Sequence, residues 1–159
     1  MTVHSLIAPH GGTLVDRVPA ADERAARLKA AASLKAVRLT SVQHSDLLCI
    51  ATGVFSPLTG FAGRRDYESI LDRMRLADGT VWSIPVTLAV SDDDARAIRE
   101  GSTIALQDPE GGIAGTLEVQ EKFSYDKRRE AAAVYRTGTR RTPAWRGCTV
   151  RARRCWVGP

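Results

Sequence analysis

Hydrophobic residues in the first half of the chain recur at helical spacing. The Ala-rich stretch 22–32 begins with acidic residues and carries Arg and Lys later, an order that complements a helix dipole. Residues 42–51 follow Ser41, a favourable N-cap, and residues 66–74 place apolar side chains three and four positions apart. These patterns predict three helices, with a short strand at 36–39 between the first two.

The second half changes to a period of two. Residues 81–90 alternate between large apolar side chains and small or polar ones, and Pro85 places this strand at an edge or a bulge. The remaining predicted elements are strands at 103–107 and 113–121, joined by a Gly-rich turn, and short helices at 92–100 and 126–135. Strands mixed with short helices, without a regular βαβ alternation, indicate an α+β fold.

Composition narrows the class of protein. The 159 residues, 43% hydrophobic and 26% charged, suit one soluble globular domain. No stretch approaches the roughly 20 apolar residues of a membrane span, and the N-terminus lacks the basic and apolar regions of a signal peptide. Three cysteines without C-x-x-C spacing argue against a disulfide framework and a zinc ribbon, and favour a reducing, cytoplasmic location.

The positive charge is concentrated at the C-terminal end. The net charge is +5, but residues 138–159 contain six arginines and no acidic residue. The rest of the chain has 17 basic residues against 18 acidic ones, so the body is close to neutral. Since binding to nucleic acid requires a basic surface on the folded body, this distribution counts against it.

Candidate chemical groups are few and poorly spaced for catalysis. The three histidines, His4, His10 and His44, form no metal-binding motif, and His10 is expected to order the N-terminal loop by hydrogen bonding. The acidic residues 92–94 lack the spacing of a calcium loop and suit the start of a helix. Cys49 is expected to be a core thiol, because no basic partner is evident. The sequence therefore predicts no catalytic, cofactor-binding or metal site.

Two adjacent arginines leave alternatives open. Arg64 and Arg65 follow a loop with two aromatic residues, where they could meet a phosphate group or a partner domain. The simpler interpretation is a solvated flank at the start of a helix. The family resemblance described below implies that, in a longer parent protein, this region faces another domain or subunit rather than a substrate.

Several motifs in series carry a family resemblance. PHGG begins at residue 9, GVFSPLTGF spans residues 53–61, RLADGTVWSIPVTLAV spans residues 75–90, and D-K-x-x-E begins at residue 126. Their order and spacing, from about residue 5 to residue 137, resemble the N-terminal domain of ATP sulfurylase (sulfate adenylyltransferase). The motif positions, to which the resemblance gives a structural role, are Pro9, His10, Gly11, Gly12, Gly53, Phe55, Ser56, Pro57, Leu58, Gly60, Phe61, Asp66, Tyr67, Asp78, Gly79, Trp82, Pro85, Asp126, Lys127 and Glu130.

The resemblance implies a fold and a parent reaction. The fold is a PUA-like pseudo-β-barrel over residues 1–137. The parent enzyme converts ATP and sulfate, its substrates, to adenosine 5′-phosphosulfate and pyrophosphate, using a downstream signature Q-x-R-N-P-x-H-x-x-H. No segment of this chain matches that signature. The expectation is therefore a non-catalytic domain without a cofactor, whose partners are the parent's catalytic domain and possible further copies in an oligomer.

Residues 138–159 have the composition of G+C-rich codons read out of frame. Restoring one C after the codon of Gly138 turns residues 139–159 into HEAHPGVARLYGAGEALLGGP. That reading resembles the H-P-G-V and G-x-x-x-L-G-G stretch with which ATP sulfurylases leave this domain. The hypothesis is a one-base deletion, real or a sequencing error, and it predicts a disordered tail at 138–159. Two other interpretations stay open: an RNA-binding module, as some PUA-like folds are, and a vestigial product without function.

Overall fold

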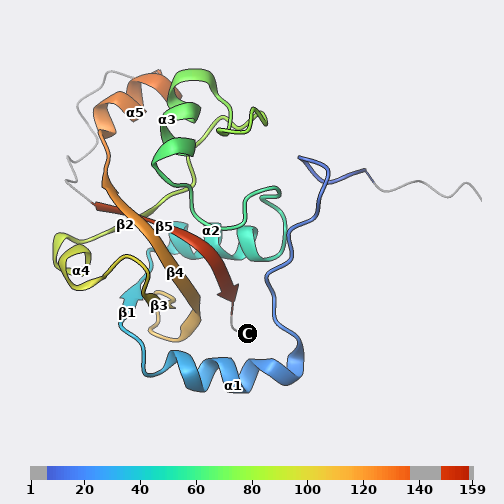
Figure 1. Cartoon of the computed structure of the whole chain (residues 1–159), viewed down its shortest axis with the longest axis vertical. Coiled ribbons are helices and arrows are strands. Elements are labelled where there is room, and N and C mark those ends of the chain that lie inside the picture. Colours follow the sequence, from blue (N-terminus) through green and yellow to red (C-terminus); the bar gives the residue numbers. More distant parts are fainter. Residues whose placement is uncertain (1–6, 137–147, 158–159) are drawn as a thin grey trace, which may run out of the picture.

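A mixed five-stranded sheet forms the centre of the molecule. The computed structural model describes residues 7–136 and 148–157 (Figure 1). The strands are β1 (Ala36–Arg38), β2 (Leu88–Val90), β3 (Thr103–Gln107), β4 (Ile113–Ser124) and β5 (Cys148–Val157). Their order is β1-β3-β4-β5-β2, with β1 parallel to β3 and the other neighbours antiparallel.

Helices lie around this sheet. They are α1 (Ala21–Ala31), α2 (Ser41–Ala51), α3 (Arg64–Arg73), α4 (Asp92–Ala97) and α5 (Lys127–Val134). Helices α3 and α5 pack side by side at one end of the long strand β4, and α1 lies at the opposite end (Figure 1). The α+β class predicted from the sequence is confirmed.

One apolar core joins the sheet to α2. Leu47 and Ile50 of α2 are fully buried, as are Leu88 of β2, Leu106 of β3 and Leu117 of β4. Leu47, Ile50 and Leu88 lie on the apolar faces that the periods of their segments predict. A second, smaller cluster of buried residues lies under α3 and α5 and is described with the site below.

Two local predictions are wrong. Thr40, not Ser41, caps α2: the Thr40 hydroxyl accepts from Gln43 N at 3.2 Å and Gln43 Oε1 accepts from Thr40 N at 2.9 Å. This is a capping box, which satisfies two backbone donors where a serine at the next position satisfies one. The strand predicted at 81–90 is reduced to β2, because residues 81–87 leave the sheet; Trp82 N donates instead to Met74 O at 2.9 Å.

The tail predicted to be disordered contains strand β5. Cys148–Val157 lies between β4 and β2, and it pairs antiparallel with both. The physical reason is that ladder hydrogen bonds use backbone groups, so the position between β4 and β2 accepts a strand whatever side chains it carries. Residues 138–147 and 158–159 of the predicted tail lie outside the described residues.

Candidate functional site

An open groove of about 960 Å³ lies between α2 and the segment that precedes α4. One wall is the N-terminal half of α2, and the opposite wall is formed by residues 81–91. The lining also includes His10, Val37, Arg38, Phe55, Asp94, Tyr125 and Tyr135. The departure of residues 81–87 from the sheet therefore contributes directly to this groove.

Three motif residues from separate segments form the aromatic floor of the groove. Phe55 and Trp82 meet edge to face, with ring centroids 5.9 Å apart, and the His10 ring lies 6.1 Å from Trp82. His10 Nε2 donates to the carbonyl oxygen of Val81 at 2.7 Å. This bond confirms the ordering role predicted for His10. The edge-to-face arrangement is one of those aromatic rings prefer.

Glycines and a serine hold the two loops behind this floor together. Gly53 has φ +81°, and a Cβ there would lie 2.6 Å from Leu14 Cδ1. The buried Ser56 hydroxyl donates to Gly53 O at 2.6 Å and accepts from Val15 N at 3.0 Å. A Cβ on Gly11 would lie 2.9 Å from Pro57. A Cβ at Gly11 would collide with the Pro57 ring, and one at Gly53 with the Leu14 side chain and the Val15 carbonyl oxygen, which explains why these two motif positions are glycine.

Gln43 and Asp46, two polar side chains of α2 that line the groove, differ in their hydrogen bonding. Gln43 Nε2 donates to Ala89 O at 2.7 Å, so this side chain links α2 to β2 as well as capping its own helix. Asp46, one turn further along α2, is half-buried in the groove and has no hydrogen-bond or ion-pair partner among the described residues. Burial raises the pKa of its carboxyl group.

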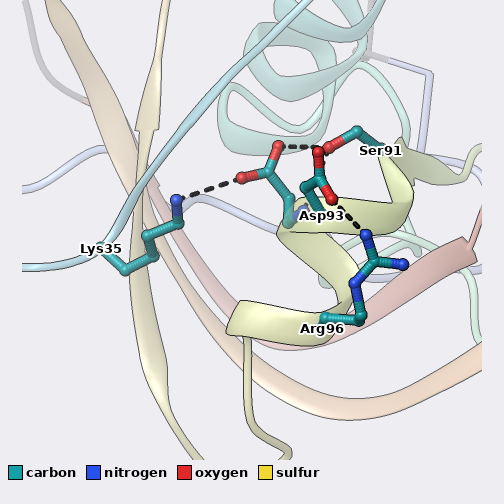
Figure 2. A network of polar contacts seen from close by, with 5 residues as sticks. Lys35, Ser91, Asp93 and Arg96 are labelled. Atoms are coloured by element: carbon teal, nitrogen blue, oxygen red, sulfur yellow. Dashed lines mark hydrogen bonds and ion pairs between the residues drawn. The ribbon is translucent and has the colours of Figure 1, made fainter.

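Asp93 and Asp94, two of the three acidic residues at the start of α4, make structural contacts. Ser91 caps the helix by accepting from Asp94 N at 3.1 Å, and its hydroxyl donates to Asp94 Oδ2 at 2.8 Å. Lys35 Nζ lies 3.2 Å from Asp94 Oδ1, and Figure 2 shows the Lys35 and Ser91 side chains of this network. Asp93 pairs with Arg96 (Figure 2). The helix-start interpretation of residues 92–94 is confirmed, because these carboxylates balance a helix N-terminus and neighbouring cations.

A second aromatic cluster includes motif residue Tyr67 and contacts α5. Tyr67 lies 5.7 Å from Phe123 and 6.0 Å from Tyr125, measured between ring centroids. The Tyr67 hydroxyl donates to Glu130 Oε2 at 3.1 Å. Burial, and then the charge of Glu130, raise the pKa of Tyr67 and likewise the pKa of Tyr125. Arg64 lies with its guanidinium carbon 5.6 Å from the centre of the Phe123 ring, which holds this arginine against the protein.

Helix α5 is held by Asp126 of the D-K-x-x-E motif and by Arg129, which occupies one of the variable positions of that motif. Asp126 Oδ1 accepts from Arg128 N at 2.8 Å and so caps the helix that Lys127 opens. Arg129 Nη2 lies 2.6 Å from Asp72 Oδ1, a bond between α5 and α3. The motif therefore fastens the last described helix to the body of the domain.

The remaining motif positions are turns and core residues. Asp66 Oδ1 accepts from Ala77 N at 2.9 Å, and Asp78 Oδ1 accepts from Thr80 N at 2.8 Å, a bond that lowers the pKa of Asp78. The other motif residues lie as follows: Leu58 and Phe61 in the main core, Gly60 buried in the loop between them, Gly79 in a turn at φ +97°, Pro9 and Gly12 in the N-terminal turn, and Pro85 in the groove wall.

Sequence reasoning missed several residues of the groove. Gln43 could have been found from the T-x-x-Q spacing of its capping box. Val42, Asp46 and Ile84 carried no such signal, since their shared location depends on how α2 sits against residues 81–91. Cys49 is half-buried, less enclosed than the core thiol that was predicted. Arg65 is exposed and borders a smaller pocket, as a solvated helix flank would.

Comparison with known proteins confirms the PUA-like fold and the family resemblance predicted from the sequence. The PUA-like domain family matches residues 7–158. The sulfate adenylyltransferase of Synechococcus sp. (strain JA-3-3Ab) is 52% identical over 138 residues, which are 86% of this chain and 35% of that relative. That of Symbiobacterium thermophilum is 50% identical over 131 residues, 82% of this chain and 33% of the relative. The chain thus spans about a third of the length of these curated relatives.

A solved structure shares the fold. It is described as a hexameric APS kinase from Thiobacillus denitrificans, and it matches with a TM-score of 0.73 at 27% identity, covering 96% of this chain and 27% of that chain. No helix in the described part of the protein is long and apolar enough to cross a membrane.

Proposed function

This chain belongs to the PUA-like domain family, and from that premise we propose that it is the N-terminal, non-catalytic domain of a sulfate adenylyltransferase. The observation that supports this most is the combination of high identity and partial coverage. The Synechococcus relative is 52% identical over 138 residues, but those residues are only 35% of its length. The domain is shared, and the larger part of the relative lies outside the match.

The proposed parent reaction is attack of a sulfate oxygen on the α-phosphorus of ATP. Pyrophosphate leaves, and adenosine 5′-phosphosulfate forms. Such a reaction needs cationic and hydrogen-bonding groups around the phosphate chain. In the family, the resemblance assigns these groups to the signature Q-x-R-N-P-x-H-x-x-H. No segment of this chain matches that signature, so the proposed role of the chain is to support a catalytic domain rather than to catalyse the reaction.

The proposed parent enzyme also implies substrates, a cellular location and an oligomeric state. ATP and sulfate bind to the catalytic domain, and no cofactor is assigned to this chain. A cytoplasmic location agrees with the cysteine spacing. Assembly into an oligomer is part of the proposal and is in keeping with the structural neighbour, whose title describes a hexamer.

We also infer that residues 139–159 are read out of frame. Their arginines, tryptophans and cysteines replace a stretch that, with one C restored, resembles the way ATP sulfurylases leave this domain. Strand β5 is compatible with this inference, because its pairing with β4 and β2 uses the backbone.

The test begins with the gene. Resequencing codons 135–165 and the following kilobase is expected to recover the missing C, then H-P-G-V and the catalytic signature in one frame. If the deletion is real, the purified chain should release no pyrophosphate from ATP and sulfate. Turnover by the purified chain alone would contradict the assignment, and so would a downstream frame without the signature.

A further inference from the structure

The groove between α2 and residues 81–91 has an exposed apolar rim. Val42 is 71% exposed, Val81 54%, Ile84 49% and Tyr135 56%. All four line the same groove, whose floor is the pair Phe55 and Trp82. Solitary exposed apolar side chains are common, but several on the lining of one concave surface are typical of an interaction site.

The groove also contains a charge that nothing in the described residues neutralises. Asp46 is half-buried there without a partner, although carboxylates in such surroundings are usually paired. Of the other ionisable groups that line the groove, Asp94 is paired with Lys35, and His10 is bonded to Val81 O. Arg38 is exposed and forms no ion pair with Asp46. An occupant that complements this surface is therefore apolar and carries a cation.

The relatives indicate where such an occupant would come from. This chain accounts for 35% of the Synechococcus enzyme and 33% of the Symbiobacterium enzyme. In a protein of that length the rest of the same polypeptide is present at high effective concentration, so a moderate apolar contact is enough to hold it. A separate protein would have to find the groove without this advantage.

We propose that the groove is the docking surface for the catalytic region of the parent enzyme, which would insert an apolar segment between α2 and residues 81–91 and set a lysine or arginine against Asp46. This inference rests on the proposed function. The apolar contact accounts for the rim, and the ion pair accounts for the unpartnered carboxylate.

A full-length hybrid enzyme tests the proposal. Residues 7–136 of this chain replace the matching part of the Synechococcus sulfate adenylyltransferase, and a site for a specific protease is placed in the connection to the rest. The intact hybrid is assayed for pyrophosphate release. It is then cut, and the Kd between the two pieces is measured by analytical ultracentrifugation.

Matched substitutions separate the groove from the rest of the surface. Val42→Asp lies in the groove and Val54→Asp outside it, at nearly equal exposures of 71% and 70%. We expect Val42→Asp to raise the Kd at least ten-fold, and Val54→Asp to change it less than two-fold. Asp46→Lys should raise the Kd at least ten-fold, and Asp46→Asn by less, because the amide still accepts a hydrogen bond.

Each outcome has a defined meaning. An active hybrid whose groove variants bind like the Val54 variant overturns the docking surface and leaves the proposed function standing. An inactive hybrid, in a format where the unmodified Synechococcus enzyme is active, overturns the proposed function and the docking surface with it. Self-association of the isolated chain that Val42→Asp abolishes assigns the groove to a second copy and also overturns the proposal.

Discussion

The two aromatic clusters of this domain differ in what covers them. Tyr67 and Phe123 are 4% and 3% exposed, and Ala133 and Val134 of α5 pack against them. Phe55 and Trp82 pack against the main core on one side and line the open groove on the other. Helix α5 of the same chain covers the first cluster, whereas the second cluster has an aromatic surface that faces the open groove.

This difference separates two uses of motif residues. Both clusters contain residues that the family resemblance singled out, so membership of a motif does not reveal whether a side chain maintains the fold or contributes to an interface. The exposure of the ring does reveal it. A ring that a helix of the same domain encloses stabilises the domain, and a ring that lines an open apolar groove is available to a partner.

The largest effect is expected in the enclosed cluster. Phe123→Ala removes a ring that is 3% exposed, and it should lower the free energy of unfolding by about 3–5 kcal/mol. The measurement is urea denaturation followed by circular dichroism. Tyr135→Ala, at 56% exposure, is the matched control, with an expected change within about 0.5 kcal/mol. Equal losses for the two variants would contradict the enclosed character of the cluster.

A smaller effect is expected in the open cluster. Trp82→Ala removes the edge-to-face contact with Phe55 and the packing on His10. Because the ring is only partly buried, the free energy of unfolding should fall by about 1–3 kcal/mol, less than for Phe123. Trp82→Phe, which keeps an aromatic ring, serves as the control in the same denaturation experiment. A loss as large as that of Phe123→Ala would place Trp82 among the enclosed residues.

The polar contact of the enclosed cluster should contribute less again. Tyr67→Phe keeps the ring and removes the hydroxyl that donates to Glu130, at an expected cost of about 1 kcal/mol. Tyr135→Phe removes a hydroxyl from a 56% exposed ring and should leave the unfolding midpoint unchanged. An unchanged midpoint for Tyr67→Phe as well would show that the bond to Glu130 does not stabilise the domain.

The smallest expected effect is that of a substitution in the groove, and it should raise the free energy of unfolding instead of lowering it. Burial raises the pKa of Asp46, so the folded state binds its proton more tightly, and the ionised carboxylate destabilises the domain at neutral pH. Asp46→Asn should raise the free energy of unfolding at pH 7 by less than about 1 kcal/mol, since the group is partly solvated. The exposed Glu110→Gln is the control.

The pH dependence of that gain checks its cause. It should shrink as the pH falls through the raised pKa of Asp46, and vanish below the unfolded value of about 3.9, where both states are protonated. Denaturation midpoints from pH 7 to pH 3 measure it. A gain that persists at pH 3 would mean that the substitution acts through something other than the charge.

Much of the fold could be predicted because its determinants are local. The helical spacing of Tyr67, Ile70 and Leu71 located α3, and the Gly-rich turn between two apolar segments located β3 and β4. Asp126 at the start of α5 and Ser91 at the start of α4 act on backbone groups two or three residues away. For such residues, the sequence neighbours are also the spatial neighbours.

Short-range patterns in the sequence therefore located the five helices, three of the five strands in full or nearly so, and the residues that carry the family resemblance. Tertiary structure alone decided that residues 81–87 leave the sheet, that His10, Phe55 and Trp82 meet, and that Asp46 lies unpartnered in their groove. It also placed Cys148–Val157 beside β4, because a free strand edge pairs through backbone groups that side chains do not encode. Contacts between distant segments depend on packing the whole chain at once, and no local pattern records them.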